Sequence, residues 1–530
     1  MRLESPSDHQ DAIFRFIEGG IGHGVVKATA GSGKTTTLVE ASYRLPNGTR
    51  SCFLAFNTHT AKELQRRLPD KVEARTVHSL GFAIMARYIG RERKLIVEPE
   101  KYRSLAEYHL KRDERTWRLP PKELRAAVTY LKDLARLIRL ELSTAALLPE
   151  LVVRYRLQPP DPALIETLHD LVWTVLEAGV AQAKEGIIDF ADMLFIPVLE
   201  KLAPPRPFDF VFVDEAQDLS KVQLAFVLGC VRKGGRLLFV GDPRQAIYGF
   251  SGADAYAVER IVEVTKATVL PLSVTYRCPV SHVRLANQFA PEMQAAPGAA
   301  QGTVCRISET VMGAHVKPGD LVLCRVNAPL INGALHLIQQ GTPARIEGRD
   351  LAGKLIADAK AAFGRSLHDW QPKLGHYEQR EHERVTRSRV PAEVFERMLA
   401  QREDELESLR AVVVFATRKG VESIADLIGY IDHLFRDAAN SVTFSTVHKA
   451  KGKEAMSVFI LYPHLMPLSF VESKEERLGE ACVQFVAVTR SLRDLTFVEA
   501  DNAPLGPAWW RQGTTAPPRE APPAAVFNVT

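Results

Sequence analysis

Short runs of apolar residues recur along the chain, separated by longer segments with helical spacing. Each run is four or five residues long, as expected for strands buried on both faces of a parallel sheet. Alternation of such strands with helices is typical of α/β proteins. We therefore expect strands at 52–56, 210–213, 237–240, 269–272, 321–324 and 458–461.

The stretch from 91 to 185 interrupts this rhythm, because it contains no convincing strand. Apolar residues recur there at the spacing of a helix face, at Leu124, Val128, Leu131 and Ile138. Basic residues share one side of the same predicted helix, namely Arg125, Lys132, Arg136 and Arg139. They form either a stripe that contacts phosphates or an ordinary solvated face.

A second stretch, 346–435, is rich in charge and also predicts helices. One apolar face is formed by Phe395, Met398, Leu399, Leu406 and Leu409. Residues 412–415 fit either a strand or a helix. The overall pattern therefore predicts two α/β cores, each interrupted by a helical insertion.

The predicted domains are discontinuous, and 530 residues suffice for several of them. The first core takes 1–90 and 186–270, with the first insertion at 91–185. The second core takes 271–345 and 436–500, with a shorter insertion at 346–435. The tail, 501–530, is rich in proline and alanine and is predicted to be poorly ordered. Within it, Trp509 and Trp510 fit packing against the body or a partner-binding peptide.

Composition adds little to this picture. With 68 basic and 63 acidic residues the net charge is +5, too small to indicate a nucleic-acid partner without a local basic surface. The six cysteines form no C-x-x-C pair, so neither a zinc site nor a disulfide framework is predicted. Without an apolar run of about 18 residues or a signal core, we expect a cytoplasmic protein with no membrane span.

Candidate chemistry begins at a glycine-rich turn, Gly31-Ser-Gly-Lys-Thr35, between a strand end and a predicted helix. Glycines let backbone N–H groups point at phosphate oxygens, and the helix N-terminus adds positive potential. Lys34 is suited to the terminal phosphates of ATP and Thr35 to Mg²⁺. A chance glycine turn is the alternative, and Ala28 replaces the usual first glycine. The predicted ATP site comprises Ala30, Gly31, Ser32, Gly33, Lys34, Thr35 and Thr36.

The predicted strand at 210–213 ends in two carboxylates. Asp214 is suited to hold Mg²⁺, and Glu215 to orient and deprotonate the attacking water. Phosphoryl transfer also needs positive charge on the transferred group. Arg277 and Arg490, both in the second predicted core, are the candidates, although each alone is more often a surface residue. If both face the first core's site, ATP lies between the two cores.

The segment Val240-Gly-Asp-Pro-Arg-Gln-Ala-Ile-Tyr-Gly-Phe-Ser-Gly-Ala-Asp254 resembles the third motif of the UvrD/Rep/PcrA-like DNA helicases, the 3′-to-5′ branch of superfamily 1. The remaining motifs of that family follow in order at 8–13, 56–64, 76–79, 189–193, 214–218, 272–277, 445–454 and 485–490. The sequences of these motifs most resemble those of the F-box DNA helicase type and of short phage and bacterial relatives. The resemblance implies two RecA-like parallel-sheet cores.

The resemblance also implies roles for single residues. In the ATP site, Gln10 is expected to read adenine, Tyr276 to stack on it and Glu454 to contact the sugar. Gln217 and Gln245 are expected to link the γ-phosphate to a DNA groove, since an amide both donates and accepts. The implied DNA contacts are Phe56, Asn57, Thr76, His78, Phe190, Tyr248, Phe250 and His448.

Tyr248 and Phe250 match aromatics that stack on bases, which suits a protein that binds any sequence. Core packing is the alternative for Tyr248. Several positions depart from the family. Among them, Ser251 stands where arginine is usual, and Lys453 where an apolar residue is usual.

The implied function is ATP-driven 3′-to-5′ movement along single-stranded DNA, with unwinding at single-strand/duplex junctions and a place in repair or recombination. Three alternatives share these motifs: a translocase that strips proteins from DNA, a DNA-sensing regulatory ATPase acting with a partner nuclease, and an RNA helicase. A protein partner would bind the second insertion or the C-terminal tail.

Overall fold

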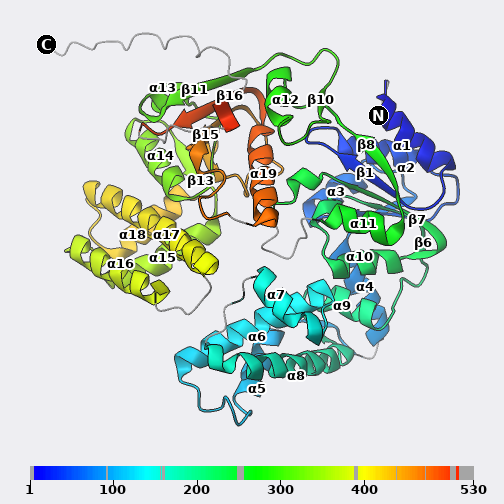
Figure 1. Cartoon of the computed structure of the whole chain (residues 1–530), viewed down its shortest axis with the longest axis horizontal. Helices are drawn as coiled ribbons and strands as arrows, with labels where there is room; N and C mark the ends of the chain where they lie inside the picture. Colours follow the sequence, from blue (N-terminus) through cyan, green and yellow to red (C-terminus); the bar gives the residue numbers. More distant parts are fainter. Residues whose placement is uncertain are drawn as a thin grey trace. The chain divides into compact units, whose positions relative to one another are not determined.

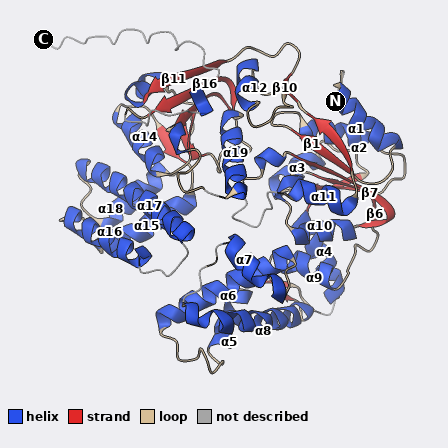
Figure 2. Ribbon diagram, in the orientation of Figure 1, coloured by secondary structure: helices blue, strands red, loops and turns tan. Residues whose placement is uncertain are grey.

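The computed structural model describes residues 5–90, 93–155, 157, 161–247, 256–386, 392–436, 438–471, 473–501 and 509–511. The chain divides into two compact units, Met1–Thr29 with Gly33–Ser273, and Ala30–Ser32 with Val274–Thr530. Figure 1 labels the elements of each unit, and Figure 2 distinguishes their helices from their strands.

A six-stranded parallel sheet forms the centre of the first unit. Val25 of one central strand lies opposite Phe239 of its neighbour. Because all strands run the same way, their carboxyl ends meet at one edge of the sheet. In spatial order the strands are β3 (Val72–Thr76), β2 (Ser51–Ala55), β6 (Phe208–Val213), β7 (Val231–Gly241), β1 (Gly24–Ala28) and β8 (Thr268–Leu272).

Helices cover both faces of this sheet. Successive residues of a strand point to opposite faces, so Val25 belongs to one apolar core and Val26 to the other. The Val26 face is covered by α1 (Asp8–Gly19), α2 (Lys34–Tyr43) and α3 (Thr58–Gln65). The Val25 face is covered by α4 (Val77–Ile89), α9 (Asp192–Leu199), α10 (Lys221–Gly229) and α11 (Ala257–Thr265).

The first insertion has an apolar core of its own, centred on Leu131, Leu134 and Val172. Its helices are α5 (Lys101–Leu110), α6 (Pro121–Glu141), α7 (Leu148–Tyr155) and α8 (Ile165–Lys184). The expectation of no strand between 91 and 185 is wrong in one detail. A two-residue strand, β4 (Ile96–Val97), pairs with β5 (Ile187–Ile188) and is too short to leave a periodic pattern.

A second six-stranded parallel sheet forms the centre of the second unit. Its strands, in spatial order, are β11 (Thr303–Ser308), β16 (Ser491–Glu499), β15 (Ala455–Leu461), β12 (Leu321–Cys324), β14 (Val442–Thr446) and β13 (Ala344–Ile346). Its helices include α12 (Val280–Ala286), α13 (Met312–His315), α14 (Ala328–Gln339) and α19 (Lys474–Val488). A separate short pair joins β9 (Val274–Thr275) to β10 (Gln294–Ala295). The prediction of two RecA-like α/β cores is confirmed.

The second insertion shares its apolar core with this sheet, because Leu355, Leu409 and Val412 pack in one cluster with Val322 and Phe444 of the strands. The segment 412–415, which fitted either structure, is helical. The helices are α15 (Arg349–Phe363), α16 (Trp370–Thr386), α17 (Ala392–Arg418) and α18 (Ile424–Leu434). Single 3₁₀ turns occur at Ala145–Leu147, Pro162–Leu164, Ala216–Asp218, Pro243–Gln245, Glu309–Val311, Pro463–Leu465 and Trp509–Arg511.

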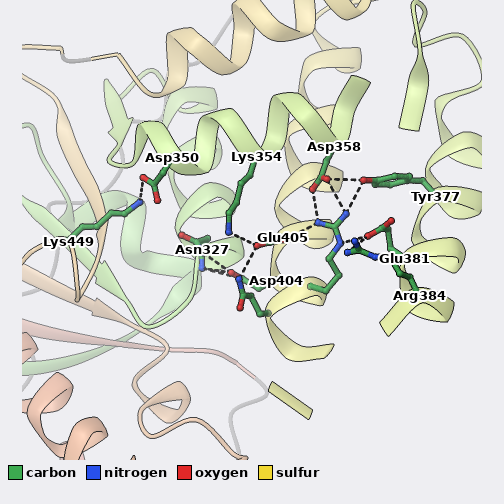
Figure 3. Close-up of polar contacts among 12 residues, drawn as sticks. Asn327, Asp350, Lys354, Asp358, Tyr377, Glu381, Arg384, Asp404, Glu405 and Lys449 are labelled. Atoms are coloured by element: carbon green, nitrogen blue, oxygen red, sulfur yellow. Dashed lines mark hydrogen bonds and ion pairs between the residues drawn. The ribbon is translucent and has the colours of Figure 1, made fainter. Parts of the chain in front are cut away.

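Polar contacts reinforce this packing (Figure 3). The Asp404 carboxylate of α17 accepts hydrogen bonds from the backbone N–H groups of Asn327 and Ala328, at 2.7–3.0 Å, where α14 begins. Arg402 donates to Asp358 of α15 and to the Tyr377 hydroxyl of α16. One arginine of α17 thus joins the three helices.

The expected packing of Trp509 and Trp510 against the body is confirmed. The Trp509 indole N–H donates to the Met466 carbonyl, and that of Trp510 to Glu499, each at 2.6 Å. All six cysteines are buried, and none of them forms a disulfide. No helix within the described ranges combines the length and apolarity that a membrane crossing requires.

Candidate functional site

The phosphate loop follows β1 and leads into α2. Gly31 (φ 70°) and Gly33 (φ 76°) lie in the left-handed region, where a side chain is strained, and Gly33 is the N-cap of α2. A Cβ on Gly31 would also collide with the Cβ of Arg277. Lys34 and Thr35 therefore begin a helix directly after the loop, and a helix N-terminus is suited to binding phosphate.

Two carboxylates at the end of β6 lie beside Lys34. The Lys34 ammonium is 3.6 Å from Oε2 of Glu215, and Glu215 has a left-handed backbone (φ 51°) directly after the strand. Asp214 is buried; burial, together with the Glu215 charge, raises the pKa of Asp214 to about 7. The hydroxyl of Thr35 and the carboxylate of Asp214 are hard oxygen donors, which fit Mg²⁺.

This raised pKa predicts a pH-dependent requirement for Mg²⁺. If Asp214 holds the cation as predicted, a proton competes with Mg²⁺ for its carboxylate, so the Mg²⁺ concentration that supports half-maximal ATP hydrolysis should rise about tenfold between pH 8 and pH 6. Titration of ATPase activity with Mg²⁺ at each pH measures it. The Asp209→Asn variant is a control at the other end of β6: hydrogen bonding by Arg232 lowers the pKa of Asp209, so the dependence should persist. A midpoint that does not change with pH would contradict the prediction.

A chain of hydrogen bonds runs from these carboxylates to the end of β7. Nε2 of Gln217 donates to Glu215 at 2.5 Å, and Oε1 of Gln217 accepts from the backbone N–H of Asp242 at 3.0 Å. Nε2 of Gln245 then donates to the Asp242 carboxylate at 2.7 Å. Gln217 and Gln245 are thus connected through Asp242, a residue that sequence reasoning missed. Their expected role in linking the γ-phosphate to a DNA groove stays a prediction.

Asp242 is fully buried, and burial raises its pKa. Its carboxylate also accepts from the backbone N–H of Arg244. The aspartate directly after a buried strand was the available signal, because Asp214 occupies the same position after β6. Tyr248, Phe250 and Ser251, which follow this turn, lie outside the described residues.

Gln10 is almost fully buried at the start of α1. Its Oε1 accepts from the backbone N–H of Ser7 in a capping box, and its Nε2 donates to the hydroxyl of Thr37 on α2 at 3.0 Å. This contact holds the Gln10 amide one helical turn from the phosphate loop. Its predicted contact with adenine stays a prediction.

Four candidate DNA contacts lie at the same sheet edge, after β2 and β3. Phe56 follows β2 with 56% of its surface exposed, and Asn57 caps α3 by accepting from the N–H of Thr60. Thr76 caps α4, and burial lowers the pKa of His78 in its first turn. Because β2 lies between β3 and β6, this group is next to the Asp214 strand end.

Phe190 is also 56% exposed, but the two aspartates beside it point inward. Asp192 accepts from Lys101 at 2.7 Å and from Arg139 at 2.8 Å, and Asp189 accepts from both guanidinium nitrogens of Arg139. The side chains of Lys101 and Asp192 have no exposed surface. In this motif the structure therefore leaves Phe190 as the side chain accessible to a ligand.

The interpretation of Arg139 as part of a basic surface stripe is wrong. Arg139 is 1% exposed, and its guanidinium lies 3.6 Å from the Tyr102 ring. It faces the same side as the apolar residues of α6 because Asp189 and Asp192 neutralise it there.

In the second unit, Tyr276 is 53% exposed and its backbone N–H donates to the Gly31 carbonyl at 2.9 Å. Arg277 forms an ion pair with Glu454 at 2.5 Å, which brings two predicted nucleotide contacts together. Arg490 is buried; its guanidinium donates to the Val486 and Lys453 carbonyls. The assignment of both arginines to the γ-phosphate stays a prediction.

His448 lies in the loop after β14. Burial, aided by the Arg325 charge, lowers the pKa of His448 to about 3. The imidazole is therefore neutral at physiological pH, so its predicted contact with DNA would be stacking or a hydrogen bond rather than an ion pair.

Comparison with known proteins gives a family match to the first half of the chain. Residues 10–264 match the model described as the UvrD/REP helicase N-terminal domain. The matched region contains the phosphate loop, the Asp214–Glu215 strand end and the Gln217–Asp242–Gln245 chain.

Several curated proteins are similar to parts of the chain. The ATP-dependent DNA helicase PcrA of Staphylococcus epidermidis is 27% identical over 315 residues, 54% of this chain and 40% of that protein. PcrA of Staphylococcus aureus is 28% identical over 286 residues, 50% of this chain and 37% of the relative. DNA helicase II of Haemophilus influenzae is 31% identical over 115 residues, 20% and 16% of the two chains. The chain thus spans less than half the length of these relatives.

Proposed function

The chain belongs to the UvrD/Rep/PcrA-like helicases of superfamily 1, and on that premise we propose that it hydrolyses ATP to move 3′-to-5′ along single-stranded DNA and to unwind duplex. The observation that carries the proposal is the chain of hydrogen bonds from Glu215 through Gln217 and Asp242 to Gln245. It joins the carboxylate beside Lys34 to the segment that precedes the candidate stacking aromatics.

Different residues of the phosphate loop and of the first sheet have different roles in the proposed reaction. The loop N–H groups and Lys34 bind the phosphates, and Glu215 orients the attacking water and accepts its proton. Thr35 and Asp214 would hold Mg²⁺, which when bound neutralises charge on the phosphates. Loss of the γ-phosphate changes the partners available to Lys34 and Glu215, and Gln217 transmits that change to Asp242.

The sheet order supports a DNA path next to this site. Phe56 and His78 follow β2 and β3, the two strands on the far side of β6 from the phosphate loop. An exposed aromatic ring stacks on any base, with about 1–3 kcal/mol per base. The side chains of Asn57 and Thr76 cap helices by accepting from backbone N–H groups, which fixes the turns that present these rings.

ATP hydrolysis should increase when single-stranded DNA is added, and strand displacement should need a 3′ tail. The measurement is phosphate release with and without a single-stranded oligonucleotide, followed by unwinding of 3′-tailed and 5′-tailed duplexes. RNA of the same sequence is the control for the nucleic acid. DNA-independent hydrolysis would overturn the motor, whereas preference for 5′ tails would overturn the polarity alone.

Protein stripping without unwinding is the second candidate. The observation that favours it is the second insertion, whose helices share the apolar core of the sheet instead of forming a core of their own. The family uses this region to contact duplex. Displacement of a bound protein from single-stranded DNA, without unwinding of a 3′-tailed duplex, would distinguish this activity.

A further inference from the structure

A small cavity lies where the second insertion begins. Its volume is about 250 Å³, and it is lined by Ile346, Glu347, Gly348, Arg349, Phe435, Lys449 and Lys453. One water molecule needs only about 10–15 Å³ of such a volume. The cavity is many times larger than that, so it has room for a phosphate group. Two of its three cations, Lys449 and Lys453, come from the loop after β14 that also carries His448 and Glu454.

The two lysines are paired with carboxylates of the insertion root. Lys449 Nζ donates to Oδ1 of Asp350 at 2.7 Å, with 32% of the lysine side chain exposed (Figure 3). Lys453 donates to Oε1 of Glu347, with 45% exposed. Both ammonium groups therefore remain accessible to an anion from solvent.

The backbone at Gly348 allows the Lys449 ammonium to lie close to it. Gly348 has φ 134°, a conformation that disfavours a side chain, and a Cβ there would collide with Nζ of Lys449. The glycine thus lets the ammonium lie against the start of α15.

The charges around the cavity do not balance. Arg349, Lys449 and Lys453, together with Arg345 at 3.8 Å from Glu347, face two carboxylates, and within the described ranges Arg349 has no ion pair. Oε2 of Glu347 is buried, and the described part of the chain offers it no hydrogen-bond partner. A bound phosphate would accept hydrogen bonds from the two lysines in place of the carboxylates, and water would then solvate the exposed Asp350 carboxylate.

We propose that Arg349, Lys449 and Lys453 form a binding site for a backbone phosphate of a nucleic-acid strand, and that Glu347 and Asp350 occupy the lysines until the strand arrives. The strand is single-stranded DNA, which rests on the proposed function. Lys453 stands where the family usually has an apolar residue, so the site is a property of this chain.

The position of Lys453 gives the site a consequence for ATP. The Lys453 carbonyl accepts from Arg490 at 3.3 Å, and the next residue, Glu454, pairs with Arg277. A phosphate that pulls the Lys453 side chain from Glu347 therefore acts on the backbone that holds two predicted nucleotide contacts.

The test is the affinity for a single-stranded oligonucleotide without ATP, measured by fluorescence anisotropy over a range of salt concentrations. The Lys449→Gln/Lys453→Gln double variant should bind on the order of tenfold more weakly, with the salt slope reduced by up to about 1.4. Glu347→Gln and Asp350→Asn should bind more tightly, because each frees a lysine. If these ion pairs only stabilised the local structure, the lysine and carboxylate variants would not change the DNA affinity in opposite directions.

Lys354→Gln is the matched control, since Lys354 on α15 forms a similar pair with Glu405 on α17, outside the cavity, and the affinity of this variant should equal that of the wild type. Wild-type-like binding by the double lysine variant would overturn the site, as would weaker binding by both carboxylate variants. A lysine effect on inorganic phosphate but not on DNA would overturn its assignment to a strand. If the double variant does not fold, the carboxylate variants decide. DNA-stimulated hydrolysis in the wild type tests the proposed function separately.

Discussion

Replacing Lys34 by alanine should lower ATP turnover by a factor on the order of 10²–10³, because the variant lacks the charge that stabilises the transferred phosphoryl group. The structure adds a second cost. Lys34 lies 3.6 Å from Glu215 and acts to lower the pKa of the adjacent, buried Asp214. Without the ammonium, the two neighbouring carboxylates repel each other unopposed, so Asp214 holds its proton to higher pH and binds Mg²⁺ less well. Steady-state phosphate release at saturating DNA measures the loss.

Lys27→Ala is the matched control for this substitution. Lys27 lies on β1, which leads into the phosphate loop, but its ammonium makes a 3.7 Å pair with Glu259 in which both side chains are well exposed. Exposed pairs contribute about 0–1 kcal/mol, so this variant should keep both its fold and its activity. A Lys34→Ala protein that retains hydrolysis within tenfold of wild type would remove the phosphate loop from the mechanism.

Asp192→Ala should destabilise the first unit by about 3–5 kcal/mol, the usual cost of breaking a buried ion pair from one side. The substitution removes the acceptor for Lys101, Arg139 and the Tyr102 hydroxyl together. Two cations would then share the single carboxylate of Asp189 in a site with almost no water. Burial lowers the pKa of Lys101. In the variant, Lys101 can therefore lose its proton, which removes one uncompensated charge and limits the loss of stability.

Urea denaturation followed by circular dichroism measures this effect, with hydrogen exchange of the α5–α8 amides to locate it. Arg103→Ala on α5, the helix that carries Lys101, is the control, because its 3.6 Å pair with Glu100 is exposed and should contribute about 0–1 kcal/mol. Equal stability of the two variants would mean that the buried pairs contribute no more than surface pairs do.

Most strands that the sequence pattern predicted have both faces buried. The apolar runs at 52–56, 210–213 and 321–324 correspond to buried segments of β2, β6 and β12. The exception is β8, predicted at 269–272, which is a largely exposed edge strand. The strands that escaped prediction include β3 and β13, which lie at sheet edges. Edge strands keep polar side chains, such as Glu73 and Arg75 on β3, and so lack a continuous apolar run.

The candidate site divides in a similar way. Lys34, Asp214 and Glu215 could be predicted because glycines and carboxylates at strand ends occupy fixed places along the chain. The roles of Asp242 and Arg139 could not, since each depends on partners 25 to 53 residues away. Local spacing placed Arg139 on a polar face, whereas two distant aspartates make its burial possible.

The two insertions differ in where their apolar side chains lie, and the difference bears on how the chain can be rebuilt. Helices α5–α8 enclose a core of their own, so exchanging the first insertion at its β4–β5 root need not open the apolar core of the sheet, provided that the replacement keeps partners for the buried Asp192 of α9. Helices α15–α18 complete the core around β12 and β14, so excising them would leave Val322 and Phe444 facing water. New specificities can therefore be grafted onto the first insertion, whereas the second must be redesigned together with the sheet that it covers.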